Sequence, residues 1–475
     1  MDIWVALVVL FAIMLIVMFS GTPIFASLGF AGVIGFLLFL APNQLQHIGV
    51  IIYEQGTHYN QIILPMFVMM SEFLSRGGIA EDIYTVLNRG IGKFRGGLAI
   101  ATTLACTIFA ALCGSSPATA ASIGKISIQE MTKRGYAPSF AVGTVAASGT
   151  LGIMIPPSIT LCLFGILTQT SIVRLLMAGI IPGLITAAFI ITFILIRVRI
   201  NPKLTNCSAE PNGPAKSAGE MNLAEAREIL SEAKNIVAEE KAQKQVEDCL
   251  AEPVVEKDVK FLAIVPALVL IFVVLGSMYF GFATPMEAAG YGVVGAFVIL
   301  IAKHRMTLKM FSGVMSGTAR TGTMMVFMIL CGFILTYVVS YLGIPIAITN
   351  AITQSGLNRY VVLLMLYVLW FILGCLMDPT SVVLLTVPFM FEPLVALGFN
   401  EIWIGVMTVI ASQIGMITPP IGMNLFVLKA NTDVQMKDII KGCWPYVVLL
   451  VFALFFFTLF PDLATILPNA MFAPG

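Results

Sequence analysis

The chain has 475 residues, of which 59% are hydrophobic and only 11% are Asp, Glu, Lys or Arg, and its formal net charge is +1. About 20 consecutive apolar residues let a helix cross a bilayer, and the sequence contains many such runs. This composition excludes an ordinary soluble protein. The sequence also has no basic cluster of the kind that binds nucleic-acid phosphates. We predict an all-α multi-pass membrane protein.

Groups that commonly form metal centres or catalytic sites are scattered along the chain. The eight cysteines show no paired spacing, and His47, His58 and His304 lie far apart. We expect the cysteines to be packing residues and no His or Cys metal centre. An intramembrane hydrolase needs a Ser-His, His-Glu or paired-Asp arrangement inside its spans, and we find none. We therefore expect no enzymatic activity and no cofactor.

The first half of the chain, residues 1–200, starts with an apolar span and contains two places where a helix must stop. One is the turn at 114–117, Gly-Ser-Ser-Pro, and the other is the stretch 149–157, which ends in Pro156-Pro157. Proline removes a backbone donor and clashes with the preceding turn, so a Pro-Pro pair after a glycine opens a helix. We predict a hairpin tip at the first place and a broken helix at the second.

Residues 201–260 form the one strong break in composition, because they are polar and rich in charge. Within them, apolar residues recur at spacings of three and four over about 222–250, which predicts an amphipathic helix. We expect a solvated linker, and docking to a partner or to the membrane surface is the alternative.

The second half, residues 261–475, repeats the first. The breaks recur at 415–420, 263 residues after 152–157, and the tip Ser116-Pro117 recurs as Asp378-Pro379, 262 residues later. A nearly constant offset indicates internal duplication. Paired interrupted segments at matching places in two halves point to a transport site.

The distribution of lysine and arginine predicts that the two halves are inverted in the membrane. The loop 41–61 has neither residue whereas its counterpart 303–320 has four, and the stretch 76–95 has four whereas 343–360 has one. Short cytoplasmic loops carry these residues. We expect both termini outside and the central linker in the cytoplasm. Since basic stretches flank 97–125 on both sides, that segment must enter and return as a re-entrant hairpin, and 361–391 must do the same from the other face, with its tip at 377–381.

Interrupted helices supply the chemistry of ion and solute binding. Free carbonyl groups can coordinate Na⁺, and half-helix N-termini attract an anion such as a carboxylate. Two tips facing two breaks predict two cation sites around one anion pocket. Asp378 is the only carboxylate at either tip and is a candidate for a cation site, although it could equally serve as a helix N-cap.

Four segments, GSSPATAASIG, GTLGIMIPPSI, MDPTSVVLLTVP and SQIGMITPPIGMNLFV, together resemble the large membrane subunit of tripartite ATP-independent periplasmic (TRAP) transporters. The resemblance covers the chain apart from 201–260. It implies a Na⁺-driven importer of organic acids such as C4-dicarboxylates or sialic acids in the bacterial inner membrane. It also implies an elevator movement of a transport domain against a scaffold. The implied partners are a periplasmic substrate-binding protein and a small four-helix membrane subunit, which we expect to be a separate chain.

Carried over by motif, the resemblance assigns residues to three groups. The first Na⁺ site would comprise Ser115, Ser116, Gly149, Thr150, Gly152 and Ile155. The second would comprise Met377, Asp378, Thr380, Gly415 and Thr418. The solute would contact Ser116, Pro117, Thr119, Pro156, Thr380, Ser381, Pro419 and Asn424. The alternative is a stand-alone Na⁺-coupled dicarboxylate transporter that needs no binding protein, and an adjacent gene for a secreted binding protein would argue against it.

Overall fold

The computed structural model describes residues 3–205, 261–420 and 422–471. Every regular element in these ranges is helical, as predicted. The α-helices of the first half are α1 (Ile3–Phe19), α2 (Ile24–Phe39), α3 (Gln46–Thr57), α4 (Ile63–Arg76), α5 (Ile79–Ile91), α6 (Gly97–Cys113), α7 (Ser116–Lys133), α8 (Pro138–Gly149), α9 (Ile159–Thr168) and α10 (Ile172–Ile200). The amphipathic helix predicted at 222–250 lies outside the described residues.

The second half follows the same order. Its α-helices are α13 (Val265–Tyr279), α14 (Pro285–Ala302), α15 (Leu308–Tyr341), α16 (Ile344–Gln354), α17 (Arg359–Leu376), α18 (Pro379–Ala396), α19 (Glu401–Met416), α20 (Met423–Asn431), α21 (Met436–Leu459) and α22 (Asp462–Met471). Short 3₁₀ turns include η2 (Tyr59–Ile62), η3 (Thr150–Ile153) and η5 (Phe261–Ile264).

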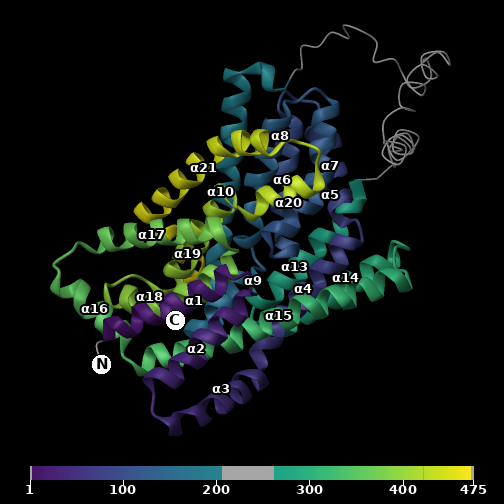
Figure 1. Ribbon diagram of the computed structural model, residues 1–475. Helices are drawn as coiled ribbons and strands as arrows, with labels where there is room; N and C mark the ends of the chain where they lie inside the picture. Colours follow the sequence, from purple (N-terminus) through teal and green to yellow (C-terminus); the bar gives the residue numbers. More distant parts are fainter. Residues whose placement is uncertain (1–2, 206–260, 421, 472–475) are drawn as a thin grey trace, which may run out of the picture.

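Helix starts in the two halves keep the offset found in the sequence. The start of α7 at 116 and of α18 at 379 differ by 263, as do those of α8 at 138 and α19 at 401. For α9 at 159 and α20 at 423 the difference is 264. The hairpins therefore correspond to each other, and so do the broken helices. The main difference between the halves is that two helices of the first half, α3 and α4, correspond to one uninterrupted helix of the second half, α15. Helix α15 packs along α2 and α4 (Figure 1).

Length and apolar composition allow six described helices to cross a bilayer by themselves, namely α10, α14, α15, α17, α18 and α21. A seventh span arises if the pair α4 and α5, bent by 58°, counts as one. The chain is thus a multi-pass membrane protein.

The broken helices occupy the centre of the molecule. All residues of α8 from Phe140 to Gly149 are buried, and so are all residues of α19 from Trp403 to Met416. Burial on every side places these two helices in the protein interior rather than at the lipid, and their polar residues Thr144, Ser148, Thr408, Ser412 and Gln413 are buried with the rest. The first interruption is buried throughout, and the second is buried up to Thr418 whereas Pro420 is exposed. Non-helical backbone is tolerated at membrane depth where it is buried in protein or lines a cavity.

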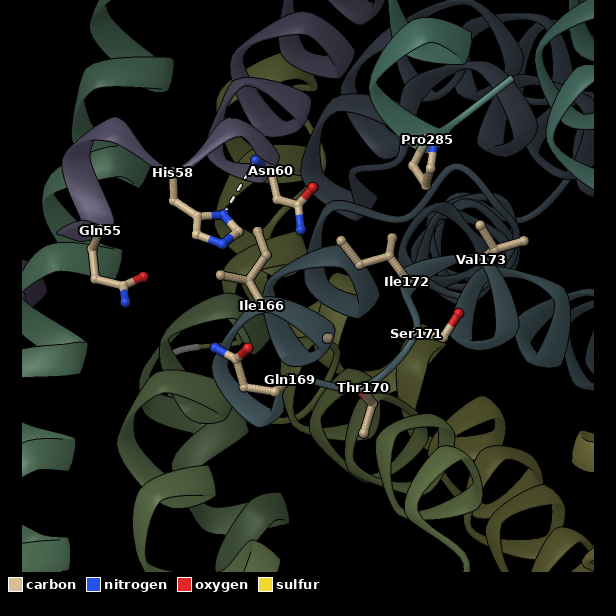
Figure 2. Close-up of a pocket in the computed structure, with 11 residues that line it drawn as sticks. Gln55, His58, Asn60, Ile166, Gln169, Thr170, Ser171, Ile172, Val173 and Pro285 are labelled. Atoms are coloured by element: carbon tan, nitrogen blue, oxygen red, sulfur yellow. Dashed lines mark hydrogen bonds between the residues drawn. The ribbon is translucent and has the colours of Figure 1, made fainter. Parts of the chain in front are cut away.

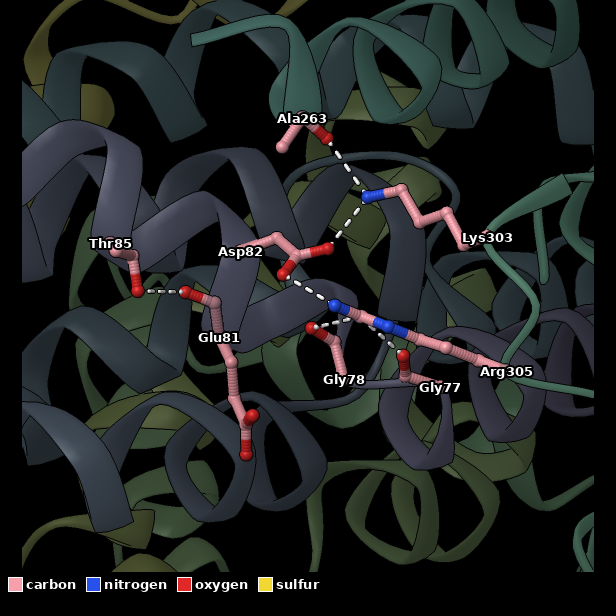
Figure 3. Close-up of polar contacts among 8 residues, drawn as sticks. All are labelled: Gly77, Gly78, Glu81, Asp82, Thr85, Ala263, Lys303 and Arg305. Atoms are coloured by element: carbon pink, nitrogen blue, oxygen red, sulfur yellow. Dashed lines mark hydrogen bonds and ion pairs between the residues drawn. The ribbon is translucent and has the colours of Figure 1, made fainter. Parts of the chain in front are cut away.

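An ion-pair cluster joins the two halves at the bend between α4 and α5 (Figure 3). Asp82 accepts bonds from Lys303 Nζ at 2.6 Å and Arg305 Nη2 at 2.8 Å. Arg305 Nη1 also donates to the carbonyl oxygens of Gly77 at 2.7 Å and Gly78 at 3.1 Å. Arg305 therefore binds the carboxyl end of α4 and the first turn of α5 at once, which holds the bend.

Candidate functional site

The first hairpin tip rests directly on the first break. Gly114 ends α6 with a φ of +66°, and a Cβ added there would lie 2.3 Å from the carbonyl oxygen of Pro157. A Cβ on Gly152 would lie 2.6 Å from the carbonyl oxygen of Ser115 and 2.6 Å from the hydroxyl of Thr119. Only glycine permits these approaches. The predicted grouping of tip residues with Gly152 is consistent with this contact.

The second tip and break approach each other in the corresponding way. A Cβ on Gly415 would lie 2.3 Å from the backbone carbon of Gly374, just before the tip. At the tip itself, Asp378 is the N-cap of α18: its Oδ2 accepts from the Ser381 amide at 3.3 Å and its Oδ1 accepts from the Ser381 hydroxyl. The N-cap interpretation of Asp378 is confirmed, and the carboxylate is only partly buried.

Two further contacts cross between the halves. Asn424, the second residue of α20, donates from Nδ2 to Ser116 Oγ at 2.8 Å and to the carbonyl of Ala146 at 3.4 Å. Thr160, the second residue of α9, lies 3.4 Å from Thr380 with hydroxyl facing hydroxyl. Each tip helix thus meets the half-helix of the opposite break, α7 with α20 and α18 with α9.

These contacts bring four helix N-termini together in two pairs that differ in capping. In the pair α9 and α18, Ser158 and Asp378 accept bonds from first-turn amides. In the pair α7 and α20, the N-cap residues Ser115 and Gly422 make no side-chain cap bond. Uncapped N-termini present free N–H groups and partial positive charge, and they attract anions. No Lys or Arg lies within 114–119, 149–160, 377–381 or 413–424, so backbone and neutral side chains must supply the donors.

The remaining predicted residues lie at the same interruptions, and their side chains bond or pack against nearby parts of the protein. The Thr150 hydroxyl donates to the Ala147 carbonyl at 2.7 Å, and the Thr418 hydroxyl donates to the Ile414 carbonyl at 2.7 Å. Ile155 packs its side chain against Gly183 of α10. The others are terminal or joining residues: Gly149 ends α8, Met377 is the C-cap of α17, Pro117 lies in the first turn of α7, and Pro156 and Pro419 precede cis prolines.

Sequence reasoning missed two buried polar residues here. Thr160 is equivalent to Asn424 at an offset of 264, and that offset could have identified it. Gln413 follows Thr150 by 263 residues, and its side chain is completely buried in the last turn of α19, which packs on η3. Neither amide atom of Gln413 has a hydrogen-bond partner among the described residues. Buried polar atoms are nearly always bonded, so this amide is a candidate ligand group.

Comparison with known proteins identifies this arrangement. A sequence profile of the family "Tripartite ATP-independent periplasmic transporter, DctM component" matches residues 11–463. The chain is 33% identical to the C4-dicarboxylate TRAP transporter large permease protein DctM of Pseudomonas aeruginosa, over 93% of this chain and 94% of that protein. It is 25% identical to the sialic acid TRAP transporter large permease protein SiaM of Vibrio cholerae, over 96% and 97%.

The fold is similar to a solved structure, the Alcanivorax borkumensis YdaH transporter, which was described as having an unusual topology. The TM-score is 0.62 at 12% identity, and the match covers 90% of this chain and 91% of that one. At this identity the likeness concerns the fold alone. The match of the family profile to almost the whole chain goes further, and the chain belongs to the DctM components, the large permease subunits, of the tripartite ATP-independent periplasmic transporters.

Proposed function

We propose that this large permease subunit imports an organic acid by Na⁺ symport, after a periplasmic binding protein has delivered the solute. The observation that carries the proposal is the meeting of the uncapped N-termini of α7 and α20 at Ser116 and Asn424. Asn424 Oδ1 is buried without a partner among the described residues, so it is free to accept from a solute hydroxyl. A carboxylate at this place would receive first-turn amide hydrogen bonds that are otherwise unused.

Sodium coupling is supported by the oxygen atoms at each tip and break. Hard cations favour carbonyl, hydroxyl and carboxylate oxygens. The Ser115 carbonyl beside Gly152 would contribute to one site, and Asp378 with the carbonyls near Gly415 would contribute to the other. Bound Na⁺ would supply positive charge next to the solute carboxylate. Because the tip helices of each half contact the half-helices of the opposite break, we propose that tips and breaks move together as an elevator against a scaffold that includes α2 and α15.

The orientation in the membrane is part of the proposal. Segments that we assign to the outside, 41–61 and 168–174, lie together around one cavity (Figure 2). Segments that we assign to the cytoplasm, 76–95 and 303–320, are joined by the Asp82 cluster (Figure 3). We therefore propose periplasmic termini and a cytoplasmic linker at 201–260 in the inner membrane. A small four-helix membrane subunit would complete the permease.

The test is solute uptake into proteoliposomes that contain this chain with the small subunit, with and without the binding protein and a Na⁺ gradient. We expect uptake to require both additions. Uptake that persists when K⁺ replaces Na⁺ would refute sodium coupling. Uptake by this chain alone, without the binding protein, would instead favour the stand-alone Na⁺-coupled dicarboxylate transporter.

A further inference from the structure

A cavity of about 390 Å³ lies apart from the tips and breaks (Figure 2). Its walls come from three parts of the chain: the end of α3 with η2, the turn between α9 and α10, and Pro285 at the start of α14. The volume is within the range of sites for small organic ligands. Since Pro285 belongs to the second half, both halves contribute to the cavity, which is partly open to the surface.

The lining combines polar and apolar side chains, and no Asp, Glu, Lys or Arg belongs to it. Its polar groups are the side-chain amides of Gln55, Asn60 and Gln169, the hydroxyls of Thr170 and Ser171, and the imidazole of His58, whose Nδ1 accepts from the Asn60 backbone amide at 3.4 Å. The N-terminus of α10, a helix of 29 residues, also opens here, although Ser171 caps one of its amides. Amide N–H groups and a helix N-terminus donate to carboxylate oxygens without trapping them as strongly as a buried arginine would.

Helix α9 runs from the cavity to the second tip. Ile166 lines the cavity, and Thr160, which contacts Thr380 at the second tip, lies six residues earlier in the same helix. At 1.5 Å per residue the two positions are about 9 Å apart along the helix axis. A solute in this cavity would therefore be little more than its own length from the pair formed by α9 and α18.

We propose that this cavity is an outer vestibule that binds the carboxylate-bearing solute before it moves to the site at the breaks. This inference rests on the proposed import function. The vestibule holds the solute through the neutral amides of Gln55 and Asn60 and the N-terminus of α10, so that it selects for hydrogen-bonding groups and releases the solute readily. The vestibule lies between α3 and the turn from α9 to α10, on the periplasmic side that we assign to these segments, so the solute would bind there first on its way to the breaks.

The test modifies the vestibule in the folded complex. Asn60→Cys is reconstituted with the small subunit and the binding protein, and it is treated with thiosulfonates that attach either a methylthio or a benzylthio group. Glu54→Cys, an exposed position on α3 outside the lining, is the matched control, and the wild type treated alike reports reaction at native cysteines. Uptake of succinate and of N-acetylneuraminate is measured before and after treatment.

We expect the small adduct at Asn60 to leave uptake within about twofold, because it makes a side chain about the size of methionine, which leaves most of the cavity open. The benzylthio adduct should lower uptake at least tenfold by filling the vestibule, and saturating solute should slow its attachment at Asn60 at least threefold but not at Glu54. Unchanged uptake with the large adduct would overturn the vestibule, and so would equal protection at both positions. Uptake by the untreated complex that does not depend on Na⁺ would refute the proposed symport, while the results with the two adducts would still decide the vestibule.

Discussion

The Asp82 cluster gives the sharpest prediction about how the two halves are held together. The Asp82 side chain is only 6% exposed, whereas Lys303 is 18% and Arg305 is 32% exposed. Replacing Asp82 by alanine removes two charge-assisted bonds. It leaves Lys303 with the Ala263 carbonyl at 3.1 Å and Arg305 with two carbonyls of the α4–α5 bend.

The expected loss lies between two known limits. An exposed ion pair contributes up to about 1 kcal/mol, and a sheltered hydrogen bond to a charged group contributes about 1.5–3 kcal/mol. Because the carboxylate is buried while both cations are partly in solvent and keep other partners, we expect roughly 2–3 kcal/mol for both bonds together. Asp82→Ala should therefore lower the free energy of unfolding by that amount.

The assay is denaturant unfolding of the purified protein in detergent, with Glu54→Ala as an exposed carboxylate control that should change stability by no more than about 0.5 kcal/mol. A double-mutant cycle between Asp82 and Arg305 should give a coupling energy of about 1–2 kcal/mol. If Asp82→Ala is as stable as Glu54→Ala, the cluster does not hold the bend, and the argument from burial fails.

Three further predictions concern the breaks. Asp378→Asn should raise the Na⁺ concentration for half-maximal uptake several-fold if the carboxylate faces a cation, and an unchanged value would leave it as a cap alone. Gly415→Ala should cost about 3 kcal/mol or more, because its Cβ would enter the backbone of the facing hairpin, whereas Gly276→Ala, with no neighbour closer than 3.9 Å, should be neutral. Gln413→Leu should keep or raise the unfolding temperature but lower uptake at least tenfold. The control Ser412→Ala should change neither the unfolding temperature nor uptake, because the Ser412 hydroxyl bonds within its own helix. A less stable Gln413→Leu would indicate a structural amide.

The sequence was sufficient to predict the duplicated architecture, because its signals repeat at a fixed distance. Proline and glycine act locally on the helix that contains them, so the ends of α6, α8, α17 and α19 could be predicted within a few residues. The same offset predicted which elements are equivalent in the two halves.

The contacts across the halves could not be predicted in this way. Knowing which elements of the two halves are equivalent does not tell which elements are in contact. The hydrogen bond between Ser116 and Asn424, for example, joins residues 308 positions apart. Gln413 was missed because one polar residue in an apolar helix has no pattern around it, and its significance comes only from burial without partners. The charges of Lys303 and Arg305 carried a topological signal in the sequence, and only the fold shows that Asp82 pairs with both.

The most direct test of the central claim is to place a negative charge where the solute carboxylate should bind. Asn424→Asp puts a carboxylate between the N-termini of α7 and α20. Two like charges about 5 Å apart repel by roughly 3 kcal/mol at an effective dielectric constant of 20, so we expect the KM for solute uptake to rise on the order of 100-fold. Asn431→Asp, at the exposed end of the same helix, should leave the KM unchanged. A KM for Asn424→Asp within twofold of the wild type, in a normally folded protein, would contradict an anion site at this junction.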